Sequence, residues 1–469
     1  MKSKIYTKTL LAIMACYALW SCEEFLDVEA PNHKIVSETV FNNDETAIST
    51  MTGIYNELFR ASYAGGGRET SIHVLAGLAA DELKNLNPNN LNLLEFEENT
   101  IQPNNSRNLS IWSSTYNIIY MTNSILEGIT ISESLTKEVK SNLEGEAKFI
   151  RAFTYFYLVN LYGEVPLILT TDYNENSLAS ANSTDEIYDQ ITQDLTKAID
   201  LLKVTYREDD RTHINKSAAE ALLARVHLFL GNWVEAERLS SNVIAQTDTY
   251  ELKDDLNQVF LANSKEAIWQ ISPIGGSGGI LTYTNEGTTF IFHPVLASLT
   301  KVALTTEIVE TFEEQDKRLL NWVGYHEDTD NYYPFKYKDR SSMGNITEYS
   351  MVLRLAEQYL IRAEARLMQN NLEGAISDLD KIRARAGLEL ISNTDPNIRK
   401  DELSMLIWEE KRKEFFTEWG HRWLNLKRTE RALSVLSEKT SGWDSMDVLF
   451  PIPAEELMKN PNLNQNPGY

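Results

Sequence analysis

The side chains that most often perform catalysis are scattered along this chain. Its seven histidines form no HExxH pattern and no close pair with a cysteine, which argues against a transition-metal site. Carboxylates are abundant, but no two are set apart as an acid and a base in different surroundings. The pairs at 313–314 and 409–410 are expected on solvated helix faces. The sequence therefore predicts no catalytic residue, no metal and no cofactor, and it favours a protein that is not an enzyme.

Phosphate chemistry and nucleic-acid binding are also disfavoured. The glycine clusters at 65–67 and 275–279 fit neither a P-loop nor a dinucleotide fingerprint followed by a helix, so we interpret them as turns. The formal net charge is −24, and no stripe rich in lysine and arginine relieves it. A surface of that sign repels phosphate backbones. We expect no nucleic-acid partner.

Aromatic side chains between 263 and 347 have the clearest binding chemistry. Flat rings offer contact area to the apolar faces of sugars or to peptide side chains at low entropy cost. We predict that four of these residues bind ligand, from position and chemistry alone: Tyr283, Trp322, Tyr325 and Tyr333. The alternative is that these rings pack the segment onto the rest of the molecule.

The elements that must position these rings are mainly helical. Ser183 and Glu186 form a capping-box pattern, and the apolar residues that follow lie on one helical stripe. Further helices are expected at 44–60, 107–129, 136–162, 216–230, 232–246, 350–369, 372–386 and 400–418.

Two helical segments repeat the same pattern. Residues 224–231 match 363–370, and each segment is followed by a large residue, a small Ala236 or Ala375, and a β-branched residue. A Gly or Asn at the turn tolerates the left-handed conformation, and the alanine lets two antiparallel helices approach closely. This pattern is typical of tetratricopeptide hairpins.

The fold class predicted is therefore mainly α: a tetratricopeptide-like scaffold of helical hairpins with a loop-rich insert that carries short strands. The helices are expected at about 44–60, 107–262 and 350–430, and the loop-rich regions at about 61–106 and 263–347. The alternating pattern at 288–292 favours a short strand. Functional residues usually lie on loops that a rigid frame supports, so these regions are expected to form the ligand face.

The N-terminus has the features of an export signal. Lys2, Lys4 and Lys8 precede an almost unbroken apolar run at 10–20, which is too short to span a bilayer as a helix. The end of this run resembles a lipobox and places Cys22 at the lipid-attachment position. We predict a signal peptide at 1–21 and a single mature domain at 22–469. The alternatives are an ordinary secretory signal with a free thiol, or a disulfide between Cys16 and Cys22.

Taken in order, the motifs of the chain resemble the RagB/SusD family over nearly the whole mature length. The segment at 22–27 is similar to the family's start after the lipobox, and the region around Trp112, Tyr116 and Asn123 to its W…Y…I…N…L helix. Residues 162–167 and 422–428 match two further family segments, and the C-terminal 460–469 is the most specific of all. Asn425 stands where the family usually has Asp.

The resemblance implies a lipoprotein on the exterior of the bacterial outer membrane. It implies capture of oligosaccharides or polysaccharides and their delivery to a SusC-like TonB-dependent transporter. Some members of the family capture peptides instead, which keeps that function as an alternative. A surface glycosidase, or a structural repeat protein with no small ligand, would be functions of other classes.

Overall fold

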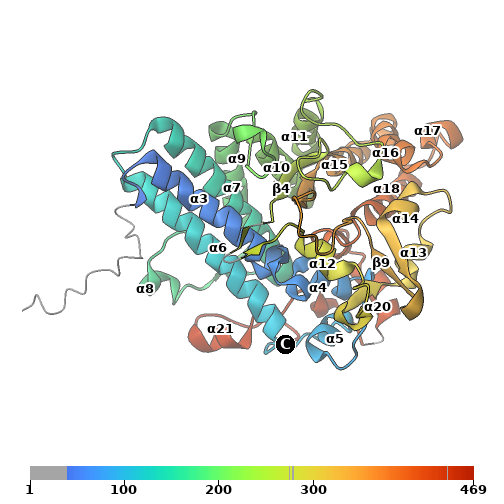
Figure 1. Cartoon of the computed structure of the whole chain (residues 1–469), viewed down its shortest axis with the longest axis horizontal. Helices are drawn as coiled ribbons and strands as arrows, with labels where there is room; N and C mark the ends of the chain where they lie inside the picture. Colours follow the sequence, from blue (N-terminus) through green and yellow to red (C-terminus); the bar gives the residue numbers. More distant parts are fainter. Residues whose placement is uncertain (1–39, 274, 277–278, 441) are drawn as a thin grey trace, which may run out of the picture.

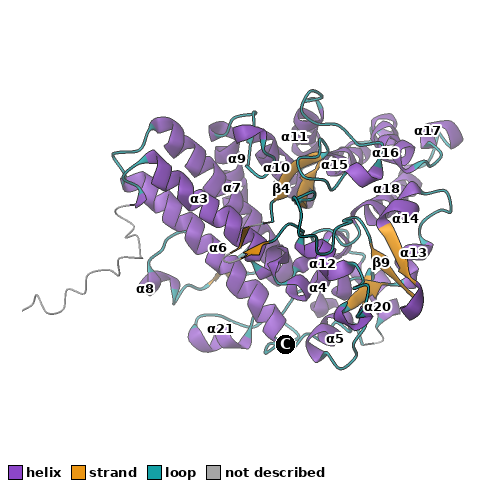
Figure 2. Cartoon of the chain, viewed as in Figure 1, coloured by secondary structure: helices purple, strands orange, loops and turns teal. Residues whose placement is uncertain are grey.

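The computed structural model describes residues 40–273, 275–276, 279–440 and 442–469. The predicted signal peptide at 1–21 and the predicted lipid-attachment residue Cys22 lie outside this range. Within it, helices dominate and short strands form small separate sheets (Figure 2). None of the helices in the described ranges is long and apolar enough to cross a membrane.

Four long helices form one end of the molecule (Figure 1): α3 (Asp44–Arg60), α6 (Ser106–Ile131), α7 (Lys137–Tyr162) and α9 (Thr184–Leu201). Helix α9 begins at the predicted capping box, in which the Glu186 N–H donates to Ser183 Oγ at 3.3 Å. Gly128 of α6 is a site of close approach, because a Cβ there would lie 2.1 Å from the ring of Phe41. Helix α7 is buried along most of its second half and forms the centre of this end.

The two predicted hairpins follow. They are α10 (Lys216–Phe229) with α11 (Trp233–Ile244), and α15 (Leu355–Met368) with α16 (Leu372–Ala386). Ala236 and Ala375 are both completely buried where the paired helices meet. The turn residues Gly231 and Asn370 have φ angles of 71° and 63°, the left-handed conformation expected of them. The mainly helical prediction with repeated hairpins is confirmed.

The strands pair only as antiparallel twos. The pairs are β1 (Leu83–Asn85) with β7 (Val302–Leu304), β2 (Val165–Pro166) with β3 (Ala181–Asn182), β4 (Ala267–Ile271) with β10 (Ser350–Arg354), β5 (Gly275–Gly276) with β6 (Gly279–Ile280), and β8 (Val323–His326) with β9 (Asn331–Pro334). Eight of these ten strands lie in or at the edges of the predicted loop-rich regions. The strand expected at 288–292 is absent there, because Thr284 caps a short helix instead, α12 (Asn285–Phe290).

The remaining helices cover the scaffold and close the insert. They are α4 (Ile72–Ala79), α5 (Leu91–Glu97), α8 (Tyr173–Asn176), α13 (Thr306–Glu310), α14 (Lys317–Trp322), α17 (Ile391–Thr394), α18 (Lys400–Phe415), α19 (His421–Arg428), α20 (Ala432–Lys439) and α21 (Ala454–Lys459). The region 61–106, expected to be loop-rich, thus contains two α-helices and two shorter helical turns, at Ser62–Gly66 and Arg68–Thr70, and every residue of α4 is buried. A large hydrophobic core spans both ends, and a smaller one lies beneath α15, α16 and α18.

Candidate functional site

The β8–β9 hairpin carries the exposed rings of the predicted ligand face. Tyr325 pairs with Tyr332 across the two strands, so both side chains lie on one face of the hairpin. Their ring centroids are 5.0 Å apart, and the side chains are 48% and 37% exposed. The Tyr325 hydroxyl donates to Asp330 Oδ1 at 2.7 Å, which fixes the first ring. The two neighbouring rings, inclined at 46° to each other, form an apolar platform that is open to solvent.

Tyr333 lies on the other face of the hairpin. Its ring covers Gly324, where a Cβ would come within 2.3 Å of ring atoms. Phe292 packs against this face, with its centroid 5.4 Å from that of Tyr333 and 4.5 Å from that of His326. Tyr333 is half-buried and so presents one edge to solvent while it supports the hairpin.

Tyr283 does not lie on the β8–β9 hairpin but in a segment that is held by its own hydrogen bonds. The neighbouring Thr282 hydroxyl donates to the Ser342 carbonyl at 2.6 Å, and Thr288 Oγ1 donates to the Arg340 carbonyl at 2.8 Å. These bonds hold the segment around α12 against residues 340–342. Tyr283 itself is half-buried and remains a candidate contact residue.

Trp322 is not a ligand contact, and that prediction is wrong. Its side chain is completely buried, and its Nε1 donates to the Leu256 carbonyl at 3.1 Å. Three cations face its ring: Lys336 Nζ at 5.0 Å, Arg385 at 5.7 Å and Arg354 at 5.8 Å from the centroid. Aromatic rings attract cations in this geometry, so Trp322 holds the insert onto the scaffold.

Tyr332 is the residue that the sequence analysis missed. Tyr332 lies in the same aromatic segment, but the sequence alone does not give the register of the hairpin, which decides which rings share a face. One feature of the sequence does indicate the pairing: Tyr325 and Tyr332 lie on either side of an acidic, turn-forming stretch at 327–330. In the structure Asp330 adopts the left-handed conformation there, with φ of 51°.

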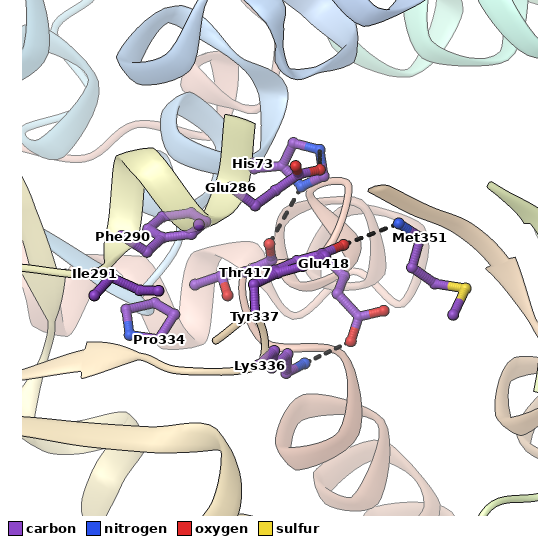
Figure 3. Close-up of a pocket in the computed structure, with 11 residues that line it drawn as sticks. His73, Glu286, Phe290, Ile291, Pro334, Lys336, Tyr337, Met351, Thr417 and Glu418 are labelled. Atoms are coloured by element: carbon purple, nitrogen blue, oxygen red, sulfur yellow. Dashed lines mark hydrogen bonds and ion pairs between the residues drawn. The ribbon is translucent and has the colours of Figure 1, made fainter. Parts of the chain in front are cut away.

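A buried polar cluster lies where His73 and Glu286 approach Thr417 and Glu418 (Figure 3). The Trp419 N–H donates to His73 Nδ1 at 3.0 Å, and the same nitrogen lies 3.3 Å from the Thr417 carbonyl, while Nε2 lies 3.6 Å from Glu286 Oε1. Burial lowers the pKa of His73, which favours its neutral form. The cavity between them measures about 10 Å³, room for roughly one water molecule. This cavity is too small for a sugar, and its lining residues pack around α12.

Lys336 anchors the base of the hairpin in the same cluster (Figure 3). Its Nζ donates to the carbonyls of Glu414 and Phe416, both at 2.9 Å, and to the Glu418 carboxylate. Burial lowers its pKa to about 8, although the nearby Glu418 charge opposes that shift. The hairpin thus projects from a fixed base two residues after β9 ends.

The carboxylates near this base belong to an ionic network in the interior. Three arginines bind five carboxylates there: Arg318, Arg354 and Arg385 with Glu266, Asp316, Glu410, Glu414 and Glu418. Glu410, expected on a solvated face, is only 1% exposed and pairs with Arg318 at 2.6 Å. That expectation was wrong because Glu410 lies on the inner face of α18. Among the described residues, no group of three or more His, Cys, Asp or Glu is arranged to hold a metal ion.

Comparison with known families matches most of the chain. Residues 24–228 match a SusD-like family described as starch-binding and associating with the outer membrane, and residues 329–469 match the SusD family. SusD-like protein P25 of Formosa agariphila is 24% identical over 98% of this chain and 99% of its own length. The starch-binding protein SusD of Bacteroides thetaiotaomicron is 24% identical over 73% of this chain and 74% of its own.

Solved structures show the same fold. A SusD superfamily protein from Bacteroides vulgatus has a TM-score of 0.79 at 22% identity, over 91% of this chain and 99% of its own. A laminarin-binding SusD-like protein has a TM-score of 0.76 at 22% identity, over 91% and 100%. The surface glycan-binding protein A from Bacteroides fluxus has a TM-score of 0.72 at 21% identity, over 91% and 99%. At these identities the likeness establishes the fold.

Proposed function

This chain belongs to the RagB/SusD family, and we propose that it is a cell-surface lipoprotein that captures oligosaccharides or polysaccharides and passes them to a SusC-like TonB-dependent transporter. The proteins that it resembles include a starch-binding protein, a laminarin-binding protein and a surface glycan-binding protein, which supports a glycan ligand here. The family acts in binding and not in catalysis, which supports a non-enzymatic role here.

The exposed pair Tyr325–Tyr332 is the observation that carries this proposal. The two rings are fixed by a hydrogen bond and by the hairpin register, so little conformational entropy is lost when a sugar ring stacks on them. The platform projects from a base that Lys336 holds in place. A rigid frame that presents open rings is suited to capture from solution and not to enclosing a reacting bond.

Affinity electrophoresis tests the platform. In native gels that contain soluble starch or laminarin, the wild-type protein should be retarded, and the double variant Tyr325→Ala/Tyr332→Ala should migrate close to its position in a plain gel. Leu433→Ala is the control, because Leu433 is also a large exposed apolar side chain (58%) but lies on α20. Equal retardation of the wild type and the double variant would remove the platform from the proposal. Release of shorter sugars from either polysaccharide would instead indicate a glycosidase.

Peptide capture is the second candidate, and one feature favours it. The loop after Phe292, which packs against the hairpin, exposes the aliphatic side chains of Val295, Leu296 and Leu299. Such side chains suit apolar peptide residues better than sugar hydroxyls. Isothermal calorimetry with a tryptic digest of casein tests this alternative. Binding heat that is lost when these three side chains are replaced by alanine, together with no retardation in glycan gels, would favour peptides.

The membrane anchor is proposed to be a lipid on Cys22. The acylated cysteine would be the first residue of the mature chain. Cys22→Ala should move the protein from the membrane fraction to the soluble fraction after expression in a bacterium that processes lipoproteins. If Cys22→Ala stays with the membrane while Cys16→Ala is released, the attachment site is Cys16.

A further inference from the structure

A second aromatic groove lies far from the hairpin. It is formed by α6, α8 and α21 and has a volume of about 470 Å³, within the range of small-molecule sites. In Figure 1 these helices lie at the left and lower side of the molecule, whereas the strand β9 lies toward its right end. The groove therefore shares no side chain with the platform of Tyr325 and Tyr332.

The floor and rim of the groove are aromatic. Tyr116 and Tyr120 are four residues apart on α6 and so face the same side of the helix. The Tyr116 hydroxyl donates to the Pro166 carbonyl at 2.9 Å, and its ring packs on Trp112 at 5.0 Å between centroids. Tyr120 and Tyr173, at the rim, are 54% and 79% exposed. Large exposed rings that border a cavity are unusual for a structural role, since they add little to the core.

The walls of the groove are fixed before any ligand arrives. Asn176 Nδ2 donates to the Thr170 carbonyl at 2.8 Å, and Asn460 Nδ2 donates to the Ala179 carbonyl at 2.8 Å. Asn462 Nδ2 adds a bond of 2.7 Å to the Leu178 carbonyl and so ties the C-terminal segment to the loop after α8. A pre-formed site loses little entropy on binding.

The charge of the groove points to the class of ligand. Its ionised lining residues are Glu456 and Lys459, which pair at 3.0 Å, and Lys459 also pairs at 2.9 Å with Glu455 beside the groove. The cation of the lining is thus already matched by carboxylates, and the chain as a whole has a formal charge of −24, so the groove suits a neutral ligand better than an anionic one. The exposed rings of Tyr120 and Tyr173, each with a hydroxyl at its tip, match the alternating apolar faces and hydroxyls of a sugar chain.

We infer that this groove is a second binding site, for a neutral oligosaccharide segment, with Tyr120 and Tyr173 as its stacking residues. The inference rests on the proposed function for its ligand class, but on different residues. Two sites at opposite ends of one rigid molecule hold a long polysaccharide at two points. The second contact then forms within one complex, which raises the apparent affinity for long chains over short ones.

Calorimetry with defined probes tests the inference. Laminarihexaose and maltoheptaose are titrated into the wild type and the double variants Tyr120→Ala/Tyr173→Ala and Tyr325→Ala/Tyr332→Ala. For the sugar that binds, the wild type should take up two molecules per chain and each double variant one. In gels with the matching polysaccharide, Tyr120→Ala/Tyr173→Ala should weaken apparent affinity about tenfold, the loss expected for stacked rings and for bivalent attachment. Tyr173→Ala alone serves as a second variant, because its side chain is largely outside the fold.

The outcomes separate this inference from the proposed function. One molecule per wild-type chain, lost only in Tyr325→Ala/Tyr332→Ala, overturns the second site and leaves the platform. One molecule lost only in Tyr120→Ala/Tyr173→Ala overturns the platform and retains the groove. Binding of neither sugar and retardation in neither gel overturn both. A wild-type dimer that Tyr120→Ala/Tyr173→Ala converts to a monomer, seen by light scattering, would assign the groove to a contact between copies and overturn the inference.

Discussion

Trp322 and the Tyr325–Tyr332 pair lie within one short stretch of the insert, yet their surroundings are opposite. Trp322 ends α14 and is completely buried, whereas Tyr325, in the strand that follows, is 48% exposed. The partners of Trp322 come from distant parts of the chain, including Arg354 and Arg385. Those of Tyr325 are local, namely Tyr332 and Asp330. Aromatic composition therefore locates the insert, but the origin of the partners decides which rings anchor it and which remain open.

The same contrast holds for charged groups. The hairpin side has exposed carboxylates near the turn, while the anchored side binds its carboxylates to arginines in the interior. Burying such a network is not a stabilising device in itself, because desolvation offsets most of the attraction. Its geometry does make the fold intolerant of losing one member. The anchored side should therefore respond to substitution through stability, and the open side through binding.

Glu414→Gln should have the largest effect. Burial alone would raise the pKa of Glu414, but the guanidinium groups of Arg385, Arg354 and Arg318 outweigh it and hold that pKa well below its ordinary value. Removing the charge leaves these buried arginines short of a partner, so we expect a loss of about 3–5 kcal/mol in the free energy of unfolding. Urea denaturation measures it. Glu409→Gln, on the half-exposed side of the same helix, is the control and should stay within about 0.5 kcal/mol. Similar losses in both variants would contradict the special role of the network.

Trp322→Phe should come next. Phenylalanine retains a ring against the cations but loses the bond from Nε1 to the Leu256 carbonyl, which is then left with only the longer bond of 3.4 Å from the Val259 N–H. Together with the smaller ring, this should cost about 1–3 kcal/mol of unfolding free energy. Glycan affinity of the folded variant should equal that of the wild type. Weakened affinity with unchanged stability would return Trp322 to the ligand site.

Glu82→Gln should change the pH dependence of stability. Burial raises the pKa of Glu82 from 4.5 to about 7, while the Thr417 N–H, which donates to it at 3.1 Å, lowers it in part. The folded state therefore binds more protons than the unfolded state between these values, so wild-type stability falls as pH rises from about 4.5 to 7. The variant has no such group, so its stability should stay level between pH 5 and pH 8, whereas that of the wild type should fall by up to about 3 kcal/mol. Urea unfolding at pH 5 and pH 8 measures this, and an unchanged pH slope would contradict it.

The sequence predicted the scaffold better than the site, for a physical reason. Helical hairpins are specified by residues close together in the chain, so Ala236 with Gly231, and Ala375 with Asn370, were sufficient to locate both turns. Whether Trp322 is buried depends on side chains that are distant in the sequence, including Arg354 of β10 and Arg385 of α16, which no local pattern reveals. Glu410 was misplaced for the same reason, since its partner Arg318 comes from the insert. Tyr332 is an intermediate case. Its aromatic side chain is visible in the sequence, but only the register of the hairpin shows that Tyr332, and not Tyr333, shares a face with Tyr325.

The smallest predicted effects concern Tyr325 and Tyr332, and they are the sharpest test of the open side. Each ring lies outside the core, so Ala substitution should change the free energy of unfolding by no more than about 0.5 kcal/mol. If sugar stacks on the rings, each Ala variant should weaken glycan binding by about 1–2 kcal/mol in calorimetry. Tyr325→Phe keeps the ring and loses only the hydroxyl bond to Asp330 that fixes it, so it should weaken binding less than Tyr325→Ala. Equal losses in Tyr325→Phe and Tyr325→Ala would mean that the hydroxyl and its bond, and not the ring face, control binding. Loss of stability in the Ala variants would place these tyrosines with Trp322 on the anchored side, and the contrast between the two regions would fail.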